Sequence, residues 1–98
     1  MMIETVKGKL VAKKEGIYLL YVFEIEIDKY VMCTQLPNWD IPNITINEVG
    51  YLMYENAVAG EKYFNPKTEK YILYNYTNTY IKNFIKDIEQ NNEEIIII

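Results

Sequence analysis

The feature that most constrains the fold is the alternation of apolar side chains along residues 17–27, IYLLYVFEIEI. Every second residue of this segment is apolar, and a period of two is typical of a β-strand, in which successive side chains point to opposite faces. The other face changes from apolar residues to two glutamates, Glu24 and Glu26. A strand that is buried on both faces at one end and hydrated at the other suits the wall of a small barrel. The residues expected to point into this barrel are Leu19, Tyr21, Phe23 and Ile25.

Other segments of similar character surround this strand, and together they predict a mainly β protein. Residues 3–12 alternate in the same way, and a turn that contains Gly16 follows them. Residues 29–36 then close a three-stranded meander. We expect two more strands at 50–58 and 69–77, each bounded by residues typical of turns.

The connection at residues 37–49 contains Pro37 and Pro42, which exclude a regular central strand. It stands where an OB-fold usually carries a helix, and the two prolines leave little room for one. We therefore expect a small antiparallel barrel of five or six strands, which is OB-like or, as the alternative, SH3-like.

Near the end of the chain the apolar period changes from that of a strand to that of a helix. This change predicts a short C-terminal helix at about residues 79–89, packed through Phe84 and Ile85. The length suits one small domain, which we expect over residues 1–88. An acidic tail with an apolar tip, residues 89–98, follows it.

The residue types that are missing exclude most familiar catalysis. The 98 residues include no His, no Arg and no Ser, and the single cysteine, Cys33, has no imidazole to deprotonate it. The four glycines stand apart, so the sequence contains no glycine-rich phosphate loop. A transition-metal site would need carboxylates alone. We therefore expect a protein that is not an enzyme, that binds no metal or cofactor, and that has no small-molecule substrate.

The ten tyrosines raise the main functional question, which is whether their rings fill a core or form a surface on which bases stack. Four of them lie in residues 71–80, YILYNYTNTY. Side chains of a barrel strand alternate between the interior and the surface, so about half of these rings belong to the core. Tyr74 and Tyr76 share one face, which is either buried or available for base stacking of the kind seen in OB-folds.

The net charge of −4 argues against nucleic acid at first sight, because phosphate groups must be met by cations. The excess of acids is confined to the end of the chain, since residues 1–86 carry ten lysines and ten acidic residues. A neutral body can still present a local basic patch near the first hairpin, or the same lysines can form an ordinary solvated face. The candidates for such a patch are Lys7, Lys9, Lys13 and Lys14.

Two features point to a protein partner or to self-association. Trp39 either anchors its loop against the barrel or protrudes as a contact hot spot. The acidic segment 89–98 resembles the C-terminal tails of single-stranded DNA-binding proteins, which dock replication partners. Alternatively, its apolar end adds a short strand to a sheet edge, in its own chain or in a neighbour's. Exposure of four β-branched residues to water is costly, so these residues imply a docking surface: Ile95, Ile96, Ile97 and Ile98.

Three stretches carry a resemblance to known proteins: YVMCTQLPNW, VGYLMYENAVAGEKYFNP and YNYTNTYIKNFI. Taken together, they resemble short phage-encoded OB-like proteins of AT-rich gut bacteria. The resemblance covers residues 3–85 and leaves the acidic segment outside. It implies a phage or mobile-element origin, and it assigns no active residues.

The leading hypothesis is a non-catalytic, OB-like phage module that binds single-stranded nucleic acid or a replication partner. The first alternative is a virion or assembly protein that binds only protein, and the second is an inhibitor of a host defence protein. The start of the chain lacks the basic-then-apolar order of a signal peptide, and no apolar run is long enough to span a membrane. We therefore expect a location in the host cytoplasm, or in the virion if the protein is structural, and no contact with a membrane.

Overall fold

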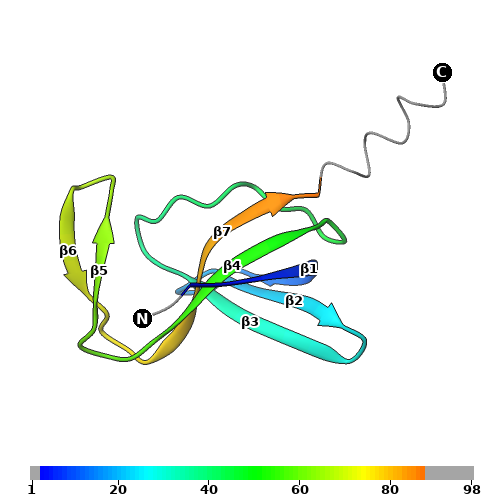
Figure 1. Cartoon of the computed structure of the whole chain (residues 1–98), viewed down its shortest axis with the longest axis horizontal. Coiled ribbons are helices and arrows are strands. Elements are labelled where there is room, and N and C mark those ends of the chain that lie inside the picture. The colour runs from blue at the N-terminus through cyan, green and yellow to red at the C-terminus, as the bar shows by residue number, and fades with distance from the viewer. Residues whose placement is uncertain (1–2, 88–98) are drawn as a thin grey trace, which may run out of the picture.

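The computed structural model describes residues 3–87, which form seven β-strands and no helix (Figure 1). In chain order the strands are β1 (Ile3–Lys14), β2 (Leu20–Glu26), β3 (Lys29–Gln35), β4 (Val49–Ala57), β5 (Lys62–Asn65), β6 (Lys70–Leu73) and β7 (Asn78–Lys86). The expectation of a mainly β protein is thus confirmed.

Five of the strands form a closed barrel with the order β1-β2-β3-β7-β4, in which β4 returns to pair with β1. The β3–β7 pair is parallel, and the other neighbouring strands are antiparallel. A three-stranded meander followed by a crossover to β4 and a final strand between β3 and β4 is the arrangement of an OB-like barrel. Of the two barrel types expected from the sequence, OB-like and SH3-like, the chain adopts the OB-like one.

The barrel interior is filled by large apolar side chains that alternate along the strands. Phe23 and Tyr21 are buried as expected, Leu19 packs against the same cluster, and Ile25 is half-buried. The ring of Phe23 stacks on that of Phe84, with 5.5 Å between the centroids. We call the following set the barrel core: Leu10, Tyr21, Phe23, Cys33, Ile44, Leu52, Tyr54, Ile81 and Phe84.

The connection between β3 and β4 contributes Ile44 to the barrel core, and Ile41 packs against that core. No part of this connection is helical. The irregular connection thus supplies apolar side chains to the barrel core.

Gly50 permits the close approach of β4 and β7. A Cβ atom at this position would lie 2.6 Å from Cζ of Phe84, which is closer than side-chain carbons approach one another. Any larger residue would displace the Phe84 ring from the barrel core, so the glycine is required by packing.

The predicted C-terminal helix is wrong, because these residues form β7. The register of β4 with β7 shifts by one residue: Met53 lies opposite Asn83 and Tyr54 opposite Ile81, which leaves Lys82 as an extra residue in a β-bulge. Ile81 and Phe84, three residues apart, therefore both point into the barrel, and this spacing imitates a helix. Ile85, which was expected to be packed, is half exposed. The last residues of the expected helix and the acidic segment lie outside the described residues.

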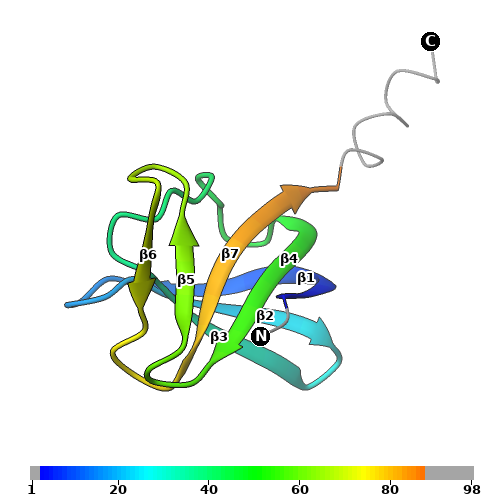
Figure 2. The same cartoon turned by 60° about the vertical axis from the view of Figure 1, so that its left-hand side comes forward.

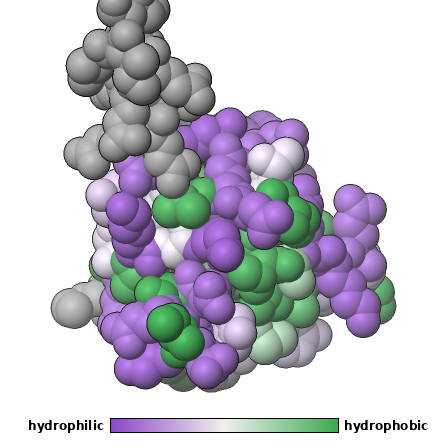
Figure 3. Space-filling model, turned by 90° about the vertical axis from the view of Figure 1, so that its right-hand side faces the viewer, coloured by the Kyte–Doolittle hydropathy of each residue, from purple (hydrophilic) through white to green (hydrophobic). Residues whose placement is uncertain are grey.

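Strands β5 and β6 form a hairpin that stands beside the barrel, with β6 farther from it than β5 (Figures 1 and 2). The side of the molecule opposite the hairpin mixes hydrophobic patches with hydrophilic residues (Figure 3). Between the hairpin and the barrel lies a second apolar cluster, which we call the hairpin cluster: Leu36, Trp39, Ala57, Tyr63, Tyr74 and Tyr80.

Candidate nucleic-acid interface

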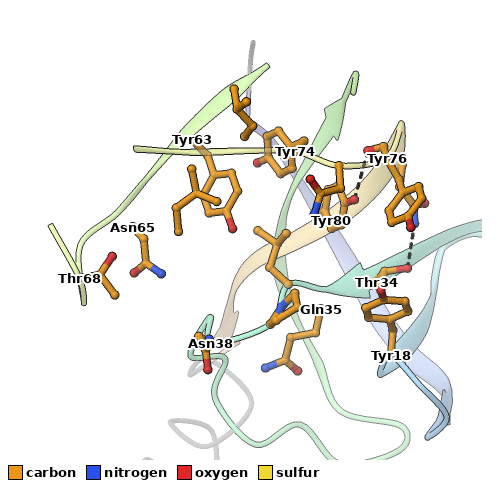
Figure 4. A pocket seen from close by; sticks show the side chains of 16 residues that line it. Tyr18, Thr34, Gln35, Asn38, Tyr63, Asn65, Thr68, Tyr74, Tyr76 and Tyr80 are labelled. Atoms are coloured by element: carbon orange, nitrogen blue, oxygen red, sulfur yellow. Dashed lines mark hydrogen bonds between the residues drawn. The ribbon is translucent and has the colours of Figure 1, made fainter. Parts of the chain in front are cut away.

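A groove of about 620 Å³ separates the hairpin from the end of β3 (Figure 4). One wall comes from the barrel, where Tyr18 of the β1–β2 loop and Thr34 of β3 line it. The other wall comes from the hairpin and from residues 74–78, which lead into β7. In OB-folds the β1–β2 loop, the connection between the fourth and fifth barrel strands and the surface of strands 2 and 3 bind extended ligands. The groove lies among these elements.

Two tyrosine rings stand at the groove with much of their surface in solvent. Tyr18 is 50% exposed and Tyr76 is 65% exposed, and each comes from a different wall. A hydrogen bond of 3.2 Å from the Tyr80 hydroxyl to the Tyr76 carbonyl oxygen holds the backbone of that wall (Figure 4). These rings are accessible to a planar group that enters the groove.

The tyrosine-rich segment 71–80 divides its rings between core and surface. Tyr74 is only 2% exposed and Tyr80 is also buried, and their rings stack with 5.0 Å between centroids. Tyr71 and Tyr76 are exposed. Of the two rings that the sequence offered for base stacking, the structure thus leaves Tyr76 accessible and places Tyr74 in the hairpin cluster, beneath the groove.

The lining of the groove is uncharged and rich in amides. Its sixteen residues include no Asp, Glu or Lys. Gln35 accepts a hydrogen bond of 2.8 Å from the Tyr21 hydroxyl, and Asn78 donates one of 3.2 Å to the Thr34 hydroxyl. The side chains of Asn38 and Asn75 make no hydrogen bond within residues 3–87, so they are available to a ligand. Amides of this kind pair with the donor and acceptor groups on the edges of unpaired bases.

Beneath the groove, a buried ion pair joins β4 to β7. The Lys82 ammonium lies 3.9 Å from the Glu55 carboxylate, and both side chains are more than nine-tenths buried. The Tyr74 hydroxyl donates a hydrogen bond to Glu55 and accepts one of 3.0 Å from Lys82. Every charged group of this set therefore has a partner, as burial in a low-dielectric site requires.

Aromatic rings surround the Lys82 ammonium. It lies 4.1 Å from the centroid of Trp39 and 4.9 Å from that of Tyr63, and Trp39 donates a hydrogen bond of 3.0 Å to the Lys82 carbonyl oxygen. Burial lowers the pKa of Lys82, while burial and then the hydrogen bond to Glu55 raise the pKa of Tyr74. This arrangement ties the hairpin to the barrel and thereby sets the position of one groove wall.

The four lysines of the expected basic patch do not line the groove. Lys7 pairs with Asp87 at 3.0 Å, Lys9 lies 3.9 Å from Glu24, and the Lys13 ammonium lies over the ring of Tyr21. Lys13 and Lys14 end β1, next to the loop that carries Tyr18. The patch is thus spread along one strand, with its last two members nearest in sequence to the groove.

Trp39 anchors its loop, which is one of the two roles that the sequence allowed. Its ring packs edge-on against Tyr63 at 6.1 Å and contacts the Lys82 ammonium, so it does not protrude as a separate contact residue. The other expected partner-binding residues, Ile95–Ile98, lie outside the described residues. Sequence reasoning missed Lys82 and Glu55, because nothing in a lone lysine or glutamate within a strand indicates burial.

Comparison with protein-family models, with curated proteins and with solved structures gives no match. Residues 3–87 contain no group of three or more acidic or cysteine side chains placed to hold a metal ion. Nor do these residues include a helix of the length and apolar character needed to cross a membrane.

Proposed function

We propose that this chain is a non-catalytic, OB-like module that binds a short stretch of single-stranded nucleic acid in the groove between Tyr18 and Tyr76. The observation that carries the proposal is the pair of exposed rings on opposite walls of an uncharged, amide-lined groove at the place where OB-folds bind extended ligands. A base that stacks on an aromatic side chain gains about 1–3 kcal/mol. Every base has a face that can stack, so this gain does not require a particular nucleotide sequence.

The uncharged lining decides which part of the strand enters the groove. Phosphates need cations, and the groove offers none, so the bases face the rings and amides while the backbone faces solvent. In this proposal Lys13 and Lys14, which end β1 next to the loop of Tyr18, meet one or two phosphates. Neutralising one or two phosphates of a single strand gives a salt slope of only about −1. Stacking then supplies most of the affinity.

The outer surface of β2 and β3 extends the binding surface beyond the groove. Tyr30 and Met32 of β3 are exposed and lie on the same face as Thr34, which lines the groove. An extended strand that leaves the groove can therefore continue over a second exposed ring. The phage origin implied by the sequence resemblance fits a module of this size that protects or presents single strands during replication.

The test is a fluorescence-anisotropy titration of labelled single-stranded oligonucleotides with the parent chain and three variants. We expect Tyr76→Ala and Tyr18→Ala each to weaken binding by about 1–3 kcal/mol, because each removes one stacking surface. Tyr71→Ala is the matched control, since Tyr71 is more exposed than either ring but lies outside the groove lining. Absence of binding by the parent chain, or an equal loss in all three variants, would contradict the proposal.

A further inference from the structure

One edge of the β5–β6 hairpin is open. Within residues 3–87, β6 pairs with β5 alone, and both ribbon views place β6 on the outer side of the hairpin (Figures 1 and 2). The Tyr74 amide donates to the Glu61 carbonyl oxygen, and hydrogen-bonded pairs alternate along an antiparallel ladder. The backbone groups of Tyr71 and Leu73 therefore point away from β5, toward the open edge.

The hairpin face beside this edge is apolar. Phe64 and Tyr71 lie opposite each other across the ladder, with their rings 5.2 Å apart, and Leu73 follows on the same face. All three are exposed, and Tyr71 is 72% exposed. An open, apolar strand edge is the feature that soluble proteins usually protect with charges, proline or a covering segment.

We propose that the Ile95–Ile98 segment of a second copy of this chain adds to the open edge of β6 as a further β-strand. Both segments are four residues long, and four consecutive isoleucines have high strand propensity and need burial. Outward backbone groups of β6 supply hydrogen bonds, while the apolar hairpin face receives alternate isoleucine side chains.

Charged residues stand at both ends of the hairpin ladder. Lys62 and Lys70 stand at the two ends of the hairpin ladder, and both are exposed. The isoleucines follow directly after Glu93 and Glu94. Because Glu61 and Glu69 stand directly beside these lysines, charge adds only a small attraction between the two segments, and it falls with salt.

The occupant belongs to a second copy because β7 leads the chain away from the hairpin. In both ribbon views β7 ends on the side of the barrel farther from β6 (Figures 1 and 2). Two chains can exchange these segments reciprocally and form a closed dimer, as isologous association requires. This inference concerns the hairpin edge and does not depend on nucleic-acid binding in the groove.

Sedimentation velocity over a range of concentrations tests the proposal with four proteins. We expect the full chain to associate, and we expect both the chain that lacks residues 95–98 and the Tyr71→Pro variant to sediment as monomers. Proline removes an outward N–H that the hairpin itself does not use, and edge strands tolerate it. Tyr71→Ala is the matched control: it retains the N–H and should associate, although more weakly than the parent.

A peptide with the sequence of residues 91–98 should bind the chain that lacks residues 95–98 and should not bind it when Tyr71 is proline. Circular dichroism on each variant establishes that the barrel is folded. A monomeric full chain, or an associated Tyr71→Pro variant, would overturn the proposal. Loss of folding on removal of residues 95–98 would also overturn it, because the isoleucines would then belong to their own chain's core.

A longer truncation, which removes residues 89–98, separates this proposal from the proposed function. Removal of residues 89–98 takes away acidic charge that repels phosphates, so affinity for single strands should be unchanged or higher. A truncated chain that is monomeric and still binds oligonucleotides supports both proposals. In another outcome the parent chain associates, the truncated chain is monomeric, and neither protein binds oligonucleotides. This outcome supports strand addition at the β6 edge and contradicts nucleic-acid binding in the groove.

Discussion

The barrel core and the hairpin cluster differ in the kind of side chain that they bury. The barrel core is built from fully buried aliphatic and aromatic side chains such as Leu10, Phe23 and Leu52. The hairpin cluster is built from tyrosines around a buried ion pair, Lys82 with Glu55. Apolar contacts are non-directional, whereas the polar contacts of the hairpin cluster hold only in one geometry. The barrel core therefore supplies most of the stability of the fold, and the hairpin cluster fixes the position of the hairpin relative to the barrel.

This difference matters for the groove, because one of its walls is the barrel and the other is the hairpin. Tyr74 links the two roles: its ring lies beneath the groove and its hydroxyl bonds to Glu55. Loss of the barrel core should abolish both clusters. Loss of the buried ion pair should affect the hairpin and the groove first and leave the barrel closed.

The largest expected effect is that of Phe23→Ala in the barrel core. Phe23 is fully buried and stacks on Phe84, so truncation leaves a cavity that rigid strands cannot fill. We expect the free energy of unfolding to fall by about 3–5 kcal/mol. Urea denaturation followed by circular dichroism measures this, and a variant with the stability of the parent would show that the inward face of β2 is misassigned.

Lys82→Met is the change that should separate the two clusters. It leaves the buried Glu55 carboxylate without its cation, for which we expect a cost of about 3 kcal/mol. Trp39 is the single tryptophan and contacts Lys82, so its fluorescence reports the hairpin cluster. Cys33 is the single cysteine and lies in the barrel core, so its reaction with a thiol reagent reports the barrel.

In this variant the Trp39 fluorescence should change at a lower urea concentration than the Cys33 reaction, and oligonucleotide affinity should fall. Burial raises the pKa of the Cys33 thiol to about 12, so the thiol is protected until the barrel opens. The double variant Lys82→Met/Glu55→Gln is the control, because it removes the unpaired charge and should regain part of the stability. Coincident transitions in the single variant would show that the two clusters form one cooperative unit.

A smaller effect on the free energy of unfolding is expected from alkaline pH, through a hydrogen bond of the barrel. The Tyr54 hydroxyl donates a hydrogen bond of 2.6 Å to Glu4, and this bond, with burial, raises the pKa of Tyr54 from 10.0 to about 12. The native state therefore keeps a proton that the unfolded chain loses. The stabilisation is complete below pH 10 and is lost as the pH rises through about 12.

Tyr54→Phe should be less stable than the parent at neutral pH, and the difference should shrink between pH 10 and 12. Urea midpoints measured at several pH values for both proteins test this expectation. The difference between the two proteins isolates the contribution of Tyr54 from that of the rest of the chain. A difference that stays constant with pH would show that the hydrogen bond to Glu4 does not shift the titration of Tyr54.

The alternation along residues 17–27 was sufficient to predict the barrel and most of its inward face, because a period of two survives wherever one face of a strand is buried. Turn residues and the two prolines likewise placed the first hairpin and the irregular connection. Such local patterns also anticipated the division of the tyrosines between core and surface. They did not predict which of the tyrosines are buried and which are exposed, because the chain bends after Leu73 and the alternation is interrupted.

The hairpin cluster was not predictable from the sequence, for a different physical reason. Lys82 is buried only because a β-bulge adds it to β7 and because Glu55, far away in the chain, lies beside it. Pairing between distant residues leaves no periodic signal in either strand. The same bulge made the sequence of β7 look helical, so one local irregularity explains both the wrong helix and the missed ion pair.

The smallest expected effect is that of Ile85→Ala, and it distinguishes a strand from a helix at this place. In a helix packed through Phe84 and Ile85, both substitutions would be costly, since neighbouring positions can share a wide apolar face. In β7, adjacent residues point to opposite faces, so Phe84 is buried in the barrel core while Ile85 is half exposed. We expect Phe84→Ala to cost about 3–5 kcal/mol, and Ile85→Ala to change the free energy of unfolding by less than about 0.5 kcal/mol. Urea denaturation of the two variants side by side provides the comparison. Similar costs for the two substitutions would contradict the strand, and with it the bulge that buries Lys82.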